Sequence, residues 1–173
     1  MPIQVNKIFN ANIYLDGTNN LIGRAAEVTL PEISVATSEH SGLGMVGTLE
    51  LPAGLQAMTL QIKWSGFYAD HMKAGANPFK AHKFQVRGSV ETYGAEGRVA
   101  EAPVVWHITA SWKKAALGGV KPKEAAEFED ELAATYVKVV HDGKELLEVD
   151  VLQNIWRAAG EDVLANYRKN IGG

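Results

Sequence analysis

Residues 136–150 read YVKVVHDGKELLEVD, and this stretch decides the class of fold. Asp142-Gly143 in its middle is a dipeptide typical of tight turns between antiparallel strands. After the turn, Leu147 and Val149 alternate with acidic residues, which gives the returning strand one apolar and one polar face. The stretch therefore predicts a β-hairpin with one side turned towards a core.

The same alternation is found in the chain before this hairpin. It recurs in residues 60–64 (LQIKW), 84–90 (FQVRGSV) and 104–112 (VVWHITASW). A second turn signal, Asp16-Gly17, ends a short apolar strand, and a further strand is expected over 26–34, at an edge or bulge because it contains Pro31. We predict a mainly β protein: an antiparallel β-sandwich or a partly closed barrel with one or two short helices and a long extended arm.

The remaining segments are expected to decorate one domain that covers residues 1–173. The expected elements are a flexible Gly-rich arm at 35–47, a short helix at 67–74 ended by a glycine, a variable loop at 114–126 and a short C-terminal helix at 161–169. Trp64, Trp106 and Trp112 fall on the apolar side of alternating strands and are expected in the core, whereas Trp156 is expected under the C-terminal helix.

Composition excludes several classes of protein. There is no cysteine, so disulfides, thiolate metal sites and a cysteine nucleophile are excluded. The net charge is −3 without a Lys/Arg-rich tract, which argues against a protein that grips nucleic acid. The N-terminus has no signal-peptide pattern, and no apolar run approaches the ~18 residues that a membrane helix needs. We expect synthesis in the cytoplasm and no membrane anchoring.

No motif for catalysis, a metal or a cofactor emerges, and we expect none of these functions. The five histidines lack the spacing of a metal site, although folding could bring His71, His82 and His107 together in a small ligand-binding barrel or a hydrolase. The acidic run at 127–131, which includes Asp130, is expected to line a solvated face.

Several ordered segments carry a resemblance to a known family. They are 10–17 (NANIYLDG), 28–33 (VTLPEI), 42–45 (GLGM), 55–58 (LQAM), 136–150 and 168–172 (RKNIG). Together they resemble the major tail tube proteins of contractile-tailed phages, including the tubes of R-type pyocin-like particles. The chain departs from the family pattern at Val46, where a polar residue is expected, and at 151–154, where a Pro-containing turn is expected.

The resemblance implies a structural role without enzymatic activity. Copies of the chain would form hexameric rings that stack into a hollow tube, which conducts DNA and templates the sheath. The implied partners are the chain itself and the sheath, tape-measure, baseplate and tail-terminator proteins, with DNA passing unbound. The protein would reside in a virion tail or tail-like particle assembled in the host cytoplasm. The alternative within the same fold is the tube protein of a bacterial secretion machine.

Two sets of residues are expected to serve the assembly. The first lies in the arm, where apolar side chains among glycines are expected to contact a neighbouring ring, unless the arm is an ordinary disordered loop: Gly42, Leu43, Gly44, Met45 and Val46. The second consists of acidic residues on solvated strand faces, which are expected to face the lumen because a basic lumen would bind DNA and slow its passage: Glu91, Glu127, Glu129 and Glu131.

Overall fold

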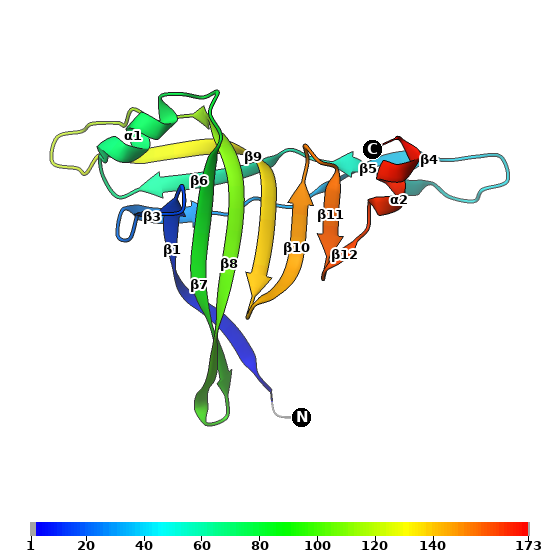
Figure 1. Ribbon diagram of the computed structural model, residues 1–173, viewed down its shortest axis with the longest axis horizontal. Helices are drawn as coiled ribbons and strands as arrows, with labels where there is room; N and C mark the ends of the chain where they lie inside the picture. Colours follow the sequence, from blue (N-terminus) through cyan, green and yellow to red (C-terminus); the bar gives the residue numbers. More distant parts are fainter. Residues whose placement is uncertain (1–2, 173) are drawn as a thin grey trace.

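Long antiparallel strands make up most of the molecule (Figure 1). This computed structural model describes residues 3–172, which contain twelve strands and two short helices. The strands are β1 (Val5–Leu15), β2 (Asn19–Asn20), β3 (Ala25–Thr29), β4 (Val35–His40), β5 (Leu49–Leu55), β6 (Met58–Trp64), β7 (His82–Gly94), β8 (Gly97–Lys114), β9 (Phe128–His141), β10 (Lys144–Asp150), β11 (Ile155–Ala158) and β12 (Glu161–Asp162). The helices are α1 (Ala69–Gly75) and α2 (Ala165–Asn170). The mainly β, antiparallel prediction is confirmed.

One strand, β9, joins the two layers of the main sheet. The long path of this sheet runs β12-β11-β10-β9-β8-β7-β1-β2, while β3 and β6 lie off it. The first half of β9, Phe128–Ala134, pairs with β6, and its second half, Tyr136–His141, pairs with β10. Since both partners use the same edge of β9, the strand bends between its halves, and β6 crosses behind β7 and β8 (Figure 1). The sheet is bent over itself without closing into a barrel.

The core lies between these two layers and follows the alternation of the strands. In β6, every second residue from Met58 to Trp64 is buried. Trp112 in β8 is buried in the same core. Trp106 and Trp156 are only partly buried and pack against the core from its margin. The prediction of core tryptophans is thus confirmed for Trp64 and Trp112.

A buried carboxylate connects the two core tryptophans. Asp130 is 1% exposed and accepts hydrogen bonds of 2.9 Å from the indole nitrogens of Trp64 and Trp112. The backbone nitrogen of Ala116 donates a third, also 2.9 Å long, which fixes the start of the loop after β8. The expectation that the whole acidic run is solvated is wrong for Asp130. The alternation of β9 turns this one residue inward, whereas Glu129 beside it is exposed.

A histidine is buried beside the same cluster. His71 in α1 is 1% exposed and stacks on Trp64, with 4.3 Å between the ring centroids. Neither of its ring nitrogens has a hydrogen-bond partner among the residues that the structure describes. The ring therefore serves as an apolar, aromatic surface that anchors α1 to the sheet.

Acid is expected to destabilise the fold through His71. Burial lowers the pKa of His71, and the nearby Asp130 and Asp70 oppose this only in part. On acidification, His71 therefore binds a proton more readily in the unfolded chain than in the folded chain. Above about pH 6.5, His71 does not change the free energy of unfolding. Below this pH, the free energy of unfolding falls by up to ~1.4 kcal/mol per pH unit because of His71.

Urea unfolding between pH 7.5 and pH 5 checks this expectation. His71→Phe keeps a ring against Trp64 and should lose less stability on acidification than the wild type. His40→Phe, at an exposed position, is the matched control and should keep the wild-type slope. Equal slopes for wild type and His71→Phe would contradict the expectation.

Three expected elements have different boundaries in the structure. The strand expected over 26–34 ends at Thr29, so Pro31 lies outside it. The first helix spans Ala69–Gly75 rather than 67–74. The C-terminal helix begins at Ala165, because residues 161–162 pair with β11 as the short strand β12 instead.

Candidate assembly surfaces

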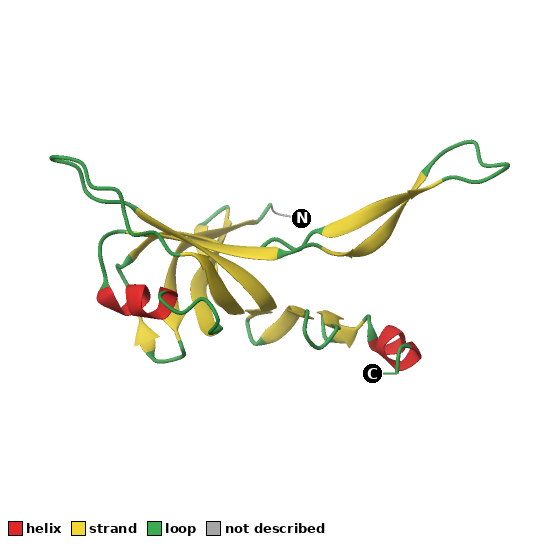
Figure 2. Cartoon of the chain, turned by 90° about the horizontal axis from the view of Figure 1, so that it is seen from above, coloured by secondary structure: helices red, strands yellow, loops and turns green. Residues whose placement is uncertain are grey.

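The arm is a two-stranded ribbon. Within residues 3–172, strands β4 and β5 pair only with each other, from Val35 opposite Leu55 at the base to His40 opposite Leu49 near the tip. The ribbon extends beyond the rest of the molecule (Figure 2). The expectation of a flexible arm at 35–47 is therefore corrected, because residues 35–40 are a strand. Its partner at 49–55 contains a proline and a glycine, which hid the pairing from the sequence pattern.

The tip of the ribbon presents apolar side chains to solvent. Leu43 and Val46 are 109% and 107% exposed, and Met45 is partly exposed. The backbone nitrogen of Met45 donates to the carbonyl of Gly42 over 3.1 Å, which closes a turn with Gly44 at a φ of +85°. A positive φ suits glycine, so the turn holds the flanking aliphatic side chains outward. This arrangement suits a contact with another molecule.

Both ends of the main sheet have unpaired strand edges within residues 3–172. Along the edge of β1 that faces away from β7, only Tyr14 and Leu15 pair, with β2. At the other end, β11 pairs with β10 only from Leu147 to Asp150, which leaves the start of β10 open. Exposed sheet edges promote pairing with further strands. Each end of the sheet therefore leaves backbone groups available to a further strand.

The four glutamates proposed for the lumen do not form one patch. Glu91 lies in β7, opposite Glu101 of β8, whereas Glu131 lies in β9, opposite Lys114 at the other end of β8. Glu91 is paired with Arg98 at 2.9 Å, and hydrogen bonds from Tyr93 and Arg98 lower its pKa. Glu131 is likewise paired, with Lys113 at 2.6 Å. Glu127 and Glu129 lie near Glu131 at the start of β9 and are exposed.

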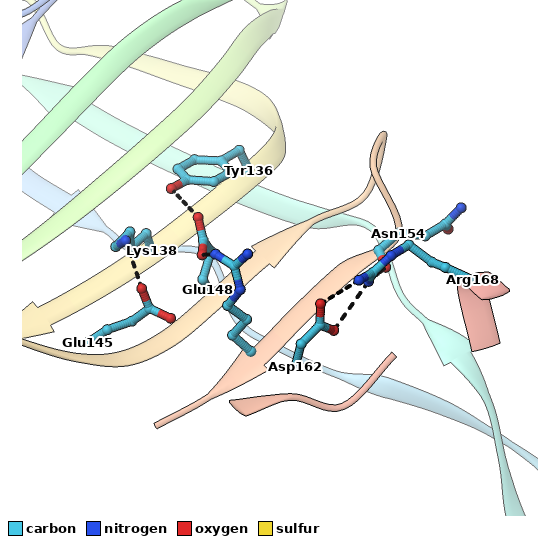
Figure 3. Close-up of polar contacts among 8 residues, drawn as sticks. Tyr136, Lys138, Glu145, Glu148, Asn154, Asp162 and Arg168 are labelled. Atoms are coloured by element: carbon cyan, nitrogen blue, oxygen red, sulfur yellow. Dashed lines mark hydrogen bonds and ion pairs between the residues drawn. The ribbon is translucent and has the colours of Figure 1, made fainter. Parts of the chain in front are cut away.

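A polar network links side chains of β9, β10 and β11 (Figure 3). The Tyr136 hydroxyl donates to Glu148 over 2.9 Å, and Arg157 donates to the other oxygen of Glu148. Burial alone would raise the pKa of Glu148, but the hydrogen bonds from Tyr136 and Arg157 outweigh it and lower the pKa. Lys138 and Glu145 add an ion pair of 2.7 Å. The network joins β9, β10 and β11 into one unit.

A second polar contact holds the C-terminal helix in place. Arg168 in α2 reaches back to both carboxylate oxygens of Asp162 (Figure 3). It also donates to the backbone carbonyl of Asn154 over 2.8 Å. Bidentate arginine–carboxylate pairs define orientation as well as distance. We call this contact, made by Asp162, Arg168 and Asn154, the C-terminal clamp.

The clamp borders an apolar groove of about 710 Å³. One wall is the base of the arm, and the other is the C-terminal segment that the clamp positions. The main apolar lining residues are Val35, Leu55, Ile155, Trp156, Val163 and Tyr167. Trp156 and Tyr167 share this groove, which agrees with the expectation that Trp156 lies close to the C-terminal helix. The sequence pattern does not reveal the groove, because its walls come from segments far apart in the chain.

The histidines do not assemble into a site. His71 and His82 lie on the core side of the strands, and the Nδ1 of His82 pairs with Asp16 at 2.8 Å. His107 lies on the opposite face, 3.2 Å from the side-chain nitrogen of Gln85. Within residues 3–172, no group of three His, Cys, Asp or Glu side chains could hold a metal ion. No helix of this part of the chain is long and apolar enough to cross a membrane.

Comparison with known proteins relates almost the whole described chain to one family. The family model "Phage tail tube protein FII" matches residues 5–172. The tail tube protein of Escherichia phage P2 is 30% identical over 165 residues, which covers 93% of this chain and 94% of the relative. The major tail tube protein of Serratia phage KSP20 is 26% identical and covers 87% of this chain and 86% of its own.

Solved structures show the same fold at lower identity. A chain of the sheath-tube complex of the extracellular contractile injection system PVC, in the extended state, has a TM-score of 0.55 at 14% identity. It covers 78% of this chain and 90% of its own length. A chain of the sheath/tube terminator of the same system has a TM-score of 0.56, also at 14% identity, over 81% of this chain and 97% of its own.

Proposed function

Because this chain belongs to the phage tail tube protein FII family, it is a structural protein of a tail tube, and we propose that it builds this tube by closing into hexameric rings that stack. The observation that carries the proposal is the pair of open edges on the main sheet. The open edge of β1 and the open start of β10 can pair between neighbouring copies. Such a head-to-tail contact closes into a ring when the rotation divides a full turn.

The proposed tube conducts DNA and templates a sheath. Its partners would be the sheath, baseplate and tail-terminator proteins and a tape measure, in a tail particle assembled in the host cytoplasm. Structural relatives in a sheath-tube complex and a sheath/tube terminator support the sheath and terminator contacts. The net charge of −3 supports passage of DNA without specific binding.

We keep Glu91, Glu127, Glu129 and Glu131 as proposed lumen residues. All four lie on strands of the main sheet or next to one, and two of them are paired with Arg98 and Lys113. Pairing would make the lumen close to neutral at these places rather than strongly acidic. A reconstruction of the assembled tube with a lumen dominated by unpaired Lys and Arg would contradict this part of the proposal.

The proposed assembly is tested by electron microscopy of the purified protein after it has been concentrated and stored. Hollow tubes or rings of uniform diameter are expected. If the protein stays monomeric, tube or baseplate seeds are added to supply a nucleus. A chain that remains monomeric on such seeds would overturn the proposal.

The rival functions have less support. A secretion-system tube shares the fold, but the family model and the relatives at 30% and 26% identity are phage tail tube proteins. A small ligand-binding barrel would need a closed sheet, and the sheet described here stays open.

A further inference from the structure

The groove beside the C-terminal clamp is an apolar surface that the folded chain leaves unfilled. Its lining combines Val35 and Leu55 at the base of the arm with Trp156 and Tyr167 of the C-terminal segment. The clamp through Arg168 fixes the helix that carries Tyr167, so the second wall is in place before any partner arrives. A pre-formed apolar groove of this kind suits aliphatic side chains from another molecule.

The tip of the arm exposes the aliphatic side chains that such a groove would bind, but it cannot reach the groove of its own chain. The groove is lined by residues at the base of the ribbon. The pairing of β4 with β5 extends the tip away from this base (Figures 1 and 2). Five residue steps of paired strand separate the base pair at Val35 from the last pair at His40, a distance of about 17 Å. The paired strands run outward from the base despite one register shift at Ala36 and Thr37, so contact between tip and groove requires two molecules.

We propose that the groove of one copy receives Leu43 and Val46 from the arm tip of a second copy. This inference rests on the proposed tube function and names the acceptor surface for the arm. Donor and acceptor lie at different places on the same chain, so the contact is heterologous. Each bound copy then offers a new free tip or groove, and the contact propagates along a growing assembly.

Charges beside the two surfaces support this pairing. Glu39 and Glu50 stand directly opposite each other on the ribbon close to its tip, and neither forms an ion pair within the described chain. Like charges in this position are unfavourable in the free subunit. The acceptor side offers Lys169 in the last turn of α2, which also has no acidic partner among residues 3–172. Docking of the tip would bring the acidic ribbon to this basic helix end.

Because the natural chain has no cysteine, disulfide cross-linking tests the contact directly. The two full-length variants Leu43→Cys and Val163→Cys place one thiol at the tip and one on the groove wall, both at exposed positions. After mixing, assembly and oxidation, a disulfide-linked dimer of the two variants is expected as the main product. Leu43→Cys mixed with Leu117→Cys is the matched control, because Leu117 is exposed on a loop away from the groove.

The outcomes separate this inference from the proposed function. Tubes with cross-links at the groove support both, and loss of the cross-link in Arg168→Ala would further support the pre-formed wall. Tubes whose tips cross-link no better to the groove than to the control overturn the inference alone. Cross-linked oligomers that never become tubes support the groove contact and overturn the tube. Neither cross-link nor tube, even on added seeds, overturns both; unchanged thermal unfolding of each variant establishes that it is folded.

Discussion

Replacing both Leu43 and Val46 with serine is expected to abolish tube growth at concentrations where the wild type assembles. Both side chains are fully exposed in the single chain, so their loss leaves its stability unchanged. Burial of an aliphatic side chain of this size contributes about 1.5–3 kcal/mol. Losing two such contacts in each step raises the concentration needed for growth by ~100-fold or more.

The measurement is the protein concentration at which tubes first pellet, with electron microscopy to identify them. Leu117→Ser combined with Val120→Ser removes two aliphatic side chains that are 82% and 88% exposed from the loop after β8 and is the matched control. The control should assemble near the wild-type concentration. Growth of the tip variant at that same concentration would show that the tip is not an assembly contact.

The second large effect is expected inside the subunit, at Asp130. In Asp130→Ala, the indole nitrogens of Trp64 and Trp112 lose their acceptor at a buried site, and the partly buried backbone nitrogen of Ala116 loses its acceptor as well. Removing one partner from a buried polar contact leaves the others unsatisfied, which costs more than the contact itself contributed. We expect a loss of about 3–5 kcal/mol in the free energy of unfolding, which is a large fraction of the stability of a typical domain.

Urea unfolding followed by tryptophan fluorescence measures this loss. Glu129→Ala changes the neighbouring carboxylate, whose side chain is exposed, and is expected to stay within about 0.5 kcal/mol of the wild type. Asp130→Asn keeps one oxygen acceptor and should fall between the two. A loss below ~1 kcal/mol in Asp130→Ala would mean that the tryptophans do not depend on the carboxylate.

These two variants probe different properties of the chain. The change at Asp130 is expected to lower the stability of the packing between the two layers. The change at Leu43 and Val46 is expected to weaken the binding between subunits. Since they are on separate parts of the fold, one variant should change stability without a direct effect on the arm, and the other should change assembly without unfolding. If the tip variant had a lowered midpoint of thermal unfolding, its loss of assembly could result from a loss of stability. Thermal unfolding curves of both variants check this point.

The class of fold could be predicted from local pattern. Alternation in 60–64 and 104–112 and the turn at Asp142-Gly143 were sufficient for paired antiparallel strands, because the side-chain period of a strand is a local property. Exposed aliphatic residues at the arm tip could also be anticipated. Leu43 and Val46 stand among glycines, with no neighbouring apolar run to cover them.

The ribbon of the arm could not be predicted in the same way. Its second strand, β5, contains Pro52 and Gly54, residues that normally weaken a strand. The two strands pair with each other and pack little against the core, so the alternation that marks a half-buried strand is absent. Residues 49–55 form a strand because their backbone pairs with β4, and not because these residues prefer the strand conformation.

What the sequence determined by itself is the antiparallel β class, the two tight turns and the resemblance to a family, because each depends on residues close together in the chain. Only the tertiary structure decided that Asp130 turns inward to two tryptophans, that His71 lacks a polar partner, and that the base of the arm meets the C-terminal segment in an apolar groove. These features join residues that are distant in sequence. Their position follows from strand register and from the bend in β9, which no local pattern encodes.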